Sequence, residues 1–260
     1  MEKIFSSVLD NYSKLSLFLL VTIALFLLVG CSQANAADYT PTLPVDHLET
    51  SNSSIENKIR SAAVRVTVPF TGGHGSGSYI RYKDVDLIFT AQHVADGAIG
   101  VNYLITYKQE SHIATLIYAD QSNDIAILYL RTSFRTIEPM KYNPLDKVAD
   151  VGTSVLYSGY PSSHKLMSFT GRVAGYEDGP GIGKQIILQT YGWFGCSGSM
   201  IYDTKGRQVG ILYGVDVEYY PEMQVQENMI WVAPITKVNI EKALRGFCRG
   251  YQGKDPKACK

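Results

Sequence analysis

From about Ile59 onward, the chain is a succession of short apolar or alternating segments separated by turn residues. The first series lies at residues 63–68, 85–89, 112–117 and 125–130, and a second series lies at residues 154–157, 171–174, 185–188, 208–212 and 229–232. Many short strands at close spacing are typical of a sandwich or barrel rather than of alternating strands and helices. Two series of about six strands each therefore predict an all-β fold of two similar antiparallel β-barrels.

The predicted folded region spans residues 59–247, with barrels at about 59–140 and 145–235. Its last part, residues 236–247, carries apolar side chains at helical spacing among Glu and Lys residues, which predicts one short C-terminal helix. Residues 248–260 are predicted to form a C-terminal tail. The 23 glycines of the chain agree with a β-rich fold that has many tight turns.

Residues 1–31 are predicted to be a signal peptide or a membrane anchor. An apolar run extends from Leu15 to Val29, and Lys3 and Lys14 precede it. A positive region followed by an apolar run is typical of an export signal. The length of the run lies near the boundary between a signal peptide and a short membrane span.

Three fates of this segment stay open. Residues 28–31 resemble a bacterial lipoprotein processing box, in which Cys31 is lipidated after cleavage. The Ala-Asn-Ala sequence at 34–36 also suits ordinary signal cleavage, and an uncleaved run would remain as an anchor. All three fates place the folded region outside the cytoplasm, in the cell envelope or beyond. Residues 32–58, rich in Ser, Thr, Asn and Pro, are then expected to be a flexible tether.

Charge and cysteine content exclude several classes of function. The 24 Lys and Arg residues balance 24 Asp and Glu residues, so the chain lacks the basic surplus of a nucleic-acid-binding protein. The four cysteines have no spacing of a paired zinc motif, so neither a metal nor another cofactor is expected. Cys248 and Cys259 either pair in an oxidising compartment or remain free thiols.

Three short segments hold the residue types that nucleophilic catalysis by a serine requires. They are Phe-Thr-Ala-Gln-His-Val at 89–94, Ser-Asn-Asp-Ile-Ala-Ile-Leu at 122–128 and Gly-Cys-Ser-Gly-Ser-Met at 195–200. A serine hydroxyl needs a base to take its proton, and the base needs a carboxylate to hold its tautomer. We therefore predict Ser197 as nucleophile, His93 as base and Asp124 as the orienting group. His74, His112, His47 and His164 have no comparable context and are expected to be structural or exposed.

The Gly-x-Ser-Gly sequence also suits stabilisation of an anionic intermediate. Glycine before the serine lets the backbone turn sharply and present N–H groups without a Cβ in the way. The predicted oxyanion donors are the backbone N–H groups of Gly195 and Ser197. The order His, Asp, Ser is that of chymotrypsin and differs from that of the other serine-hydrolase folds.

Together these segments resemble those of trypsin-like serine proteases. The bacterial Deg/HtrA branch is similar in further places: Gly-Ser-Gly-Ser-Tyr-Ile at 75–80, Gly-Tyr-Pro at 159–161, Gly-Arg-Val at 171–173 and Ala-Pro-Ile at 233–235. The resemblance covers about residues 59–245, with no PDZ domain expected after it. It implies a chymotrypsin-type fold and a serine endopeptidase that cleaves polypeptides through an acyl-enzyme, without a cofactor.

Two residues depart from the family pattern. Cys196 replaces the Asp that pairs with a new N-terminus when a trypsin-like zymogen is activated, so that route of activation is not expected. Cys196 is predicted to be a buried thiol, because the register of the motif assigns the nucleophile to Ser197. Ser199 replaces the second glycine. These departures leave open the alternative of a catalytically inactive binding protein that keeps the protease fold.

The resemblance also implies the position of the substrate pocket. Tyr191 lies six residues before the predicted nucleophile, where trypsin carries an Asp. Tyr213, Gly214 and Val215 are expected to form the strand beside the substrate. Because no carboxylate is evident among these residues, we predict an apolar preference at the residue before the scissile bond.

Overall fold

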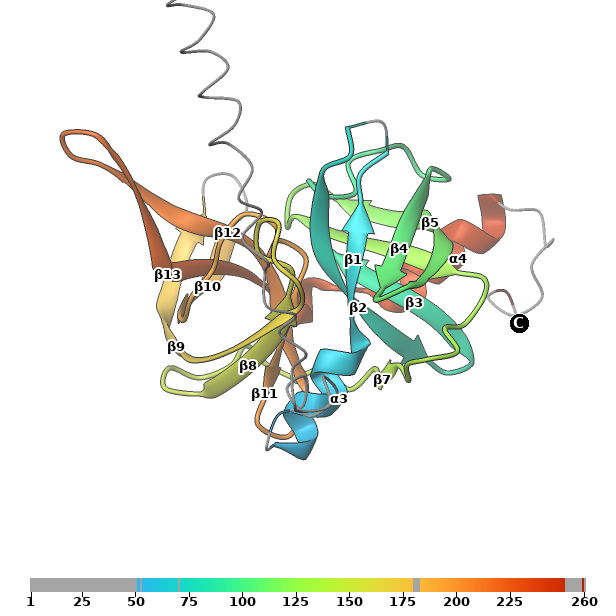
Figure 1. The fold of residues 1–260 in the computed structure, drawn as a ribbon, viewed down its shortest axis with the longest axis horizontal. Helices are drawn as coiled ribbons and strands as arrows, with labels where there is room; N and C mark the ends of the chain where they lie inside the picture. The colour runs from blue at the N-terminus through green and yellow to red at the C-terminus, as the bar shows by residue number, and fades with distance from the viewer. Residues whose placement is uncertain (1–50, 52, 70, 180–182, 251–258, 260) are drawn as a thin grey trace, which may run out of the picture. The chain divides into compact units, whose positions relative to one another are not determined.

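The computed structural model describes residues 51, 53–69, 71–179, 183–250 and 259 (Figure 1). The predicted export segment, Cys31 and the tether before residue 51 lie outside these residues. No helix within the described ranges is both long and apolar enough to span a membrane.

The first barrel is a closed ring of six strands. They are β1 (Ala63–Thr67), β2 (His74–Tyr82), β3 (Val85–Thr90), β4 (Asn102–Tyr107), β5 (Glu110–Asp120) and β6 (Ile125–Leu130). Hydrogen bonding follows the order β1-β4-β5-β6-β3-β2, and an additional pairing of β1 with β2 closes the ring. A short strand, β7 (Met140–Lys141), adds in parallel beside β2.

The second barrel is closed as well. Its strands are β8 (Ser154–Gly159), β9 (Met167–Gly179), β10 (Gly183–Gln189), β11 (Met200–Asp203), β12 (Gln208–Tyr219) and β13 (Met223–Pro234). They follow the order β10-β13-β12-β11-β8-β9. The predicted all-β fold of two six-stranded barrels is therefore confirmed.

Strands β3 and β6 show how the barrels are joined. All residues of both strands are buried, because each strand packs on both of its faces. Ile88 and Leu128 face the interior of the first barrel. Their neighbours Phe89 and Ile127 point the opposite way, as strand geometry requires, into a second cluster. That cluster also contains residues of the second barrel, namely Leu156, Met200, Tyr202, Ile211 and Ala233.

A helix that the sequence analysis did not predict precedes the first barrel. Helix α3 (Ser54–Ala62) begins inside the predicted tether, which was expected to extend to residue 58. Ser53 caps it by accepting a hydrogen bond from Glu56 N at 3.4 Å, and Ile59 is buried in the cluster shared by the barrels. Arg60 donates to Ser168 Oγ at 2.9 Å in the second barrel. Tertiary contacts thus stabilise a helix whose sequence is short and polar.

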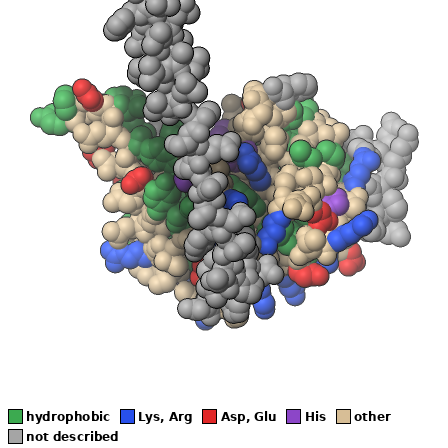
Figure 2. Space-filling model, in the orientation of Figure 1, with side chains coloured by type: hydrophobic (Ala, Val, Ile, Leu, Met, Phe, Trp, Pro, Cys, Tyr) green, Lys and Arg blue, Asp and Glu red, His purple; other side chains and the backbone are tan. Residues whose placement is uncertain are grey.

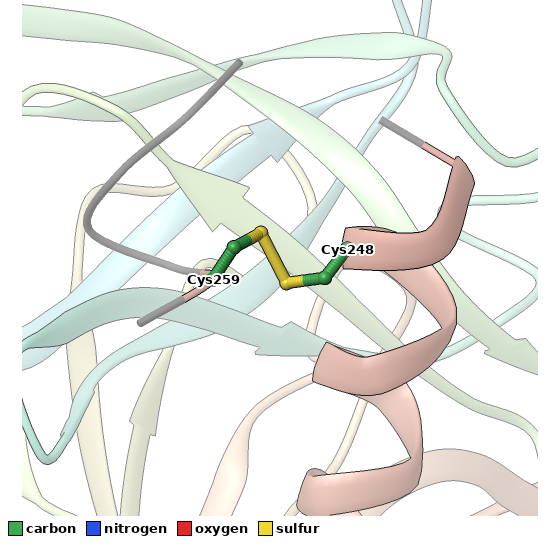
Figure 3. The surroundings of a disulfide bond; sticks show 2 residues. All are labelled: Cys248 and Cys259. Atoms are coloured by element: carbon green, nitrogen blue, oxygen red, sulfur yellow. A yellow bond between two sulfur atoms is a disulfide. The ribbon is translucent and has the colours of Figure 1, made fainter. Parts of the chain in front are cut away.

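The C-terminal part contains the predicted helix in a longer form. A 3₁₀ turn, η1 (Ile235–Lys237), leads into α4 (Ile240–Gly250), which extends past the predicted end at residue 247. Cys248, near the end of α4, forms a disulfide with Cys259, with Cα atoms 5.4 Å apart (Figure 3). The paired alternative for these cysteines is therefore the one that the structure contains. Cys196 is a free, buried thiol.

We predict that Phe247 is the main apolar contact between α4 and the first barrel. Its side chain is buried, and its ring centroid lies 5.4 Å from that of Tyr129. Phe247→Ala should lower the free energy of unfolding by about 3 kcal/mol, because it leaves a cavity beside β6. Urea denaturation measures this change. Lys242→Ala, at an exposed position of the same helix, is the control, and an equal loss in both variants would contradict the prediction.

Candidate active site

The pairing of β3 with β6 brings two of the predicted site residues to one end of the first barrel. Thr90, the last residue of β3, lies opposite Ala126 of β6. His93 follows β3 by three residues, and Asp124 directly precedes β6, so both lie just beyond the same end of this strand pair. Antiparallel neighbours bring the end of one strand to the start of the next.

The Asp124 carboxylate holds His93 at two points. Its Oδ2 accepts from the ring Nδ1 at 2.7 Å, and its Oδ1 accepts from the backbone N–H of His93 at 2.8 Å. Because the carboxylate is the acceptor, the Nδ1 atom carries the proton and Nε2 is left with a lone pair. Asp124 adopts a left-handed conformation (φ 52°), which Asp tolerates better than most residues. His93 stays about half exposed, so its ring is accessible from the solvent.

Ser197 lies in the loop between β10 and β11, in the second barrel. Its Oγ donates to the Tyr213 carbonyl at 3.5 Å, and in the part of the chain that the structure describes no hydrogen bond joins it to His93. The loops of the two residues nevertheless meet at Gly75. A Cβ on Gly75 would lie 2.5 Å from Val94 Cγ2 and 2.9 Å from the Ser197 carbonyl oxygen. Only glycine at this position lets the histidine and serine loops approach so closely.

The peptide group between Phe194 and Gly195 is oriented by a hydrogen bond to its carbonyl oxygen. The Phe194 carbonyl accepts from the Ser162 N–H at 2.7 Å. In a trans peptide the C=O and N–H point in opposite directions, so the Gly195 N–H points away from Ser162. Gly195 has a φ of 93°, and a Cβ there would lie 2.4 Å from the Tyr160 carbonyl oxygen. Neither Gly195 N nor Ser197 N has an acceptor among the described residues.

Ser76 of β2 connects the first barrel to the loop that contains these two N–H groups, by binding the carbonyls of Gly195 and Ser197. Its N–H donates to the Ser197 carbonyl at 2.8 Å, and its Oγ donates to the Gly195 carbonyl at 2.7 Å. The same Oγ accepts from Tyr160 N at 2.9 Å, and the Ser76 carbonyl accepts from Thr90 Oγ1 at 2.7 Å. The sequence analysis used Ser76 only as part of a strand and missed this role. The run of small residues Gly75-Ser76-Gly77 is the sequence signal from which a close backbone approach could have been predicted.

His74 lies beside the same loop, although the sequence analysis regarded it as merely structural or exposed. Its Nδ1 accepts from Arg65 Nη2 at 2.9 Å, because a guanidinium can only donate. Its Nε2 therefore carries the proton and donates to the Tyr160 carbonyl at 3.1 Å. Burial lowers the pKa of His74, the hydrogen bond to Tyr160 opposes this shift, and the charge of Arg65 adds to it.

The predicted pocket residues fall into two groups. Tyr191 is partly exposed, its ring centroid lies 5.2 Å from that of Phe169, and its carbonyl accepts from Tyr157 Oη. The Tyr213 side chain, in contrast, packs against the clusters of the first barrel and of the barrel interface. Burial raises the pKa of Tyr213, and the negative charge of Asp124 raises it further.

Strand β13 brings Glu227 close to Gly192 and Tyr191, and the sequence analysis did not predict this residue as part of the pocket. A Cβ on Gly192 would lie 2.4 Å from Ile230 Cγ2 and 3.5 Å from Val215 Cγ1, so the side chains beside Gly192 are apolar. The Gly192 N–H donates to the Glu227 carbonyl at 2.7 Å. Burial raises the pKa of Tyr191, and the negative charge of Glu227 raises it further. A carboxylate therefore does approach Tyr191, from a strand far away in the sequence.

Cys196 is buried in the core of the second barrel. Burial raises the pKa of its thiol, against the opposing effects of hydrogen bonds from the Trp193 backbone and from Tyr157. A buried neutral thiol is a poor nucleophile, so the environment of Cys196 favours the predicted packing role over a role as the nucleophile.

Sequence comparison assigns the chain to a family. Residues 75–211 match the trypsin-like peptidase domain, and the protein belongs to that family. The sequence matches no curated protein.

Solved structures share the fold. The active form of the Rv3671c protease from M. tuberculosis has a TM-score of 0.59 and 19% identity, over 75% of this chain and 85% of that one. A serine endoprotease from Yersinia pestis has a TM-score of 0.59 and 22% identity, over 75% and 67% of the two chains. The HtrA-type protease AlgW with a tripeptide has a TM-score of 0.59 and 18% identity, over 72% and 60%. The resemblance to trypsin-like proteases of the Deg/HtrA kind is thus confirmed for the fold.

We predict that His74 makes stability depend on pH. Its pKa is lower in the folded chain than the ordinary value of 6.5, so the unfolded chain binds the proton more tightly. The free energy of unfolding should be highest above pH 6.5 and should fall as the pH decreases from there through the folded pKa. His74→Gln should flatten this slope, and His164→Gln, at an exposed position, should not. Urea denaturation between pH 5 and pH 8 tests it (roughly the range in which His titrates); identical slopes would contradict the prediction.

Proposed function

We propose that the protein is a serine endopeptidase that hydrolyses peptide bonds through an acyl-enzyme on Ser197. The observation that carries the proposal is the two-point hydrogen bonding of His93 to Asp124 at the loop junction with Ser197. A fixed tautomer with a free Nε2 is what a general base for a serine hydroxyl requires. Membership of a peptidase family supports polypeptides as the substrate class.

In the proposed mechanism, the Ser197 hydroxyl turns about χ1 from the Tyr213 carbonyl towards His93 Nε2. It attacks the scissile carbonyl carbon while His93 takes its proton, and Asp124 stabilises the resulting imidazolium. The N–H groups of Gly195 and Ser197, which have no acceptor among the described residues, bind the oxyanion. His93 then donates the proton to the leaving amine. Water attacks the acyl-enzyme, His93 takes the proton of the water, and Ser197 recovers its own on release of the acid.

The disulfide supports a further proposal about location. Disulfides persist in oxidising compartments and are rare in the cytosol. The pair Cys248–Cys259 therefore supports export of the folded region to the cell envelope or beyond. We propose in addition that the protein is attached to the membrane, through Cys31 or through the apolar run of residues 15–29.

One structural observation adds to the sequence departures that leave open a catalytically inactive binding protein. Ser197 Oγ is directed at the Tyr213 carbonyl and not at His93. Catalytic hydrogen bonds are often long or misaligned without substrate, so this rotamer is compatible with both functions. An active-site probe separates them.

We predict that a fluorophosphonate probe labels the protein at Ser197. Labelling should be lost in Ser197→Ala and slowed by at least about a thousandfold in His93→Ala, because the base is removed. Ser199→Ala is the matched control, since the buried Ser199 Oγ has no hydrogen-bond partner among the described residues. Mass spectrometry of the labelled peptide measures the site. Folded protein that stays unlabelled would favour the binding protein.

We also predict that Ser76 is a positioning residue for the oxyanion donors. Ser76→Ala removes the hydrogen bond that holds the Gly195 carbonyl, so kcat should fall about 10- to 100-fold with KM little changed, because the oxyanion forms only in the transition state. Ser78→Ala, also buried on β2, is the control, since its hydroxyl forms no hydrogen bond to this loop among the described residues. Steady-state kinetics on a peptide substrate measures the split. Lower stability with unchanged kcat would contradict the assignment.

A further inference from the structure

The hairpin formed by β12 and β13 extends well beyond the second barrel (Figure 1). Its outer part, residues 216–226, is here called the hairpin arm. Within the arm, Asp216, Val217, Glu218 and Tyr219 pair with Gln226, Val225, Gln224 and Met223 respectively. Residues 217–224 are all exposed. The arm is therefore a two-stranded ribbon with no third strand among the described residues.

The edge of β12 is unpaired from the active site to the tip of the arm. On that side β11 pairs with β12 only as far as Ile211. Just beyond, the Tyr213 carbonyl accepts from Ser197 Oγ, so the open edge begins at the proposed nucleophile. The edge runs on to Tyr219, a distance of about 20 Å at the usual rise of a strand. An unpaired edge of this length is a template for another extended chain.

The two faces of the arm have different chemistry. Alternation along β12 and the pairing with β13 put Val217, Tyr219, Val225 and Met223 on one face, and Asp216, Glu218, Gln224 and Gln226 on the other. On the first face, Tyr219 is 76% exposed and Met223 is 61% exposed, and Tyr220 at the turn is 84% exposed. Figure 2 shows apolar and acidic side chains together at this end of the molecule.

The arm and its base also carry a charge of one sign. Residues 213–231 contain four carboxylates, at Asp216, Glu218, Glu222 and Glu227, and no Lys or Arg. None of the four forms an ion pair with another described residue. Asp216 accepts from the Val217 N–H at 3.0 Å, a bond that an added strand would have to replace, and Glu218 accepts from the Gln226 amide at 3.3 Å. A partner that brings basic side chains to the arm would therefore meet negative charge that no Lys or Arg of the arm compensates.

We propose that the hairpin arm is an extended substrate-binding surface that takes the segment of a polypeptide N-terminal to the scissile bond as an added strand. It selects segments in which Lys or Arg alternates with bulky apolar residues, since one face of the added strand meets the carboxylates and the other meets Tyr219 and Val217. The inference rests on the proposed function. The side is set by the geometry: the oxyanion donors of the acyl half belong to the second barrel, whereas His93, which faces the leaving amine, belongs to the first.

The test uses the full chain and three fluorogenic peptides that are identical around the cleaved bond. One ends shortly before that bond, one continues N-terminally with alternating Lys and aromatic residues, and one has Glu in place of Lys. We expect the long basic peptide to have the highest kcat/KM. Glu218→Gln with Glu222→Gln should lower that value about fivefold to tenfold, as expected for two exposed charge pairs. Tyr219→Ser should lower it by about tenfold through lost apolar contact.

Controls separate the arm from general charge and from catalysis. Glu177→Gln with Asp178→Asn removes two exposed carboxylates from β9 and should leave kcat/KM for the long basic peptide unchanged. The short peptide should be cleaved equally by all variants, because it does not reach the arm. High salt should reduce the advantage of the basic peptide over the acidic one.

Binding to the Ser197→Ala variant distinguishes failure of this inference from failure of the proposed function. Fluorescence anisotropy of labelled long peptides measures affinity without turnover. Equal affinities for basic and acidic peptides, with hydrolysis intact, would overturn the role of the arm. Tight, arm-dependent binding of the basic peptide by a protein that cleaves none of the peptides would support the surface and overturn the endopeptidase. Arm-dependent self-association by sedimentation, with no effect of the arm on peptides, would assign the edge to a second copy and overturn the inference.

Discussion

The hydrogen bonds of Ser76 are the contact on which the rest of the candidate site depends. The proposed base and its orienting carboxylate belong to the first barrel, and the proposed nucleophile with its oxyanion loop belongs to the second. Ser76 binds the carbonyls of Gly195 and Ser197 from the strand that leads into the histidine loop. Because its side chain is fully buried, these bonds lie in a medium of low polarity where they are strong and costly to leave unmade. The barrel interface thereby sets the distance between base and nucleophile.

The position of Cys196 shows how the loop is held without the ion pair that forms when a trypsin-like zymogen is activated. A carboxylate there would lie in the core of the second barrel and would need a cation, whereas a thiol needs none. The neighbouring peptides are fixed by neutral hydrogen bonds, from Ser162 to the Phe194 carbonyl and from Ser76 to the Gly195 carbonyl. The loop is therefore oriented by bonds that are present in the folded chain itself, and its conformation does not require a new N-terminus.

Local patterns in the sequence predicted the barrels and the three central site residues, because alternation and the motifs around His93, Asp124 and Ser197 are short-range signals. They did not predict α3, which is stabilised by contacts with both barrels, or the approach of Glu227 to Tyr191. Nor did they show that the Tyr213 side chain packs against the first barrel and the barrel interface. Each of these features depends on segments that are distant in the chain and meet only through the pairing order of the strands.

The hairpin arm departs from the compactness of the rest of the fold for a reason that bears on function. An isolated two-stranded ribbon is at best marginally stable in water, and this one is held only where it continues into the barrel, at Val215 opposite Ile230. Leaving Tyr219 and Met223 exposed and the edge of β12 unpaired forgoes both apolar burial and hydrogen bonding. A third strand at that edge supplies both at once. Since the edge starts beside Ser197, a polypeptide that fills it as proposed would also place one of its bonds at the proposed nucleophile.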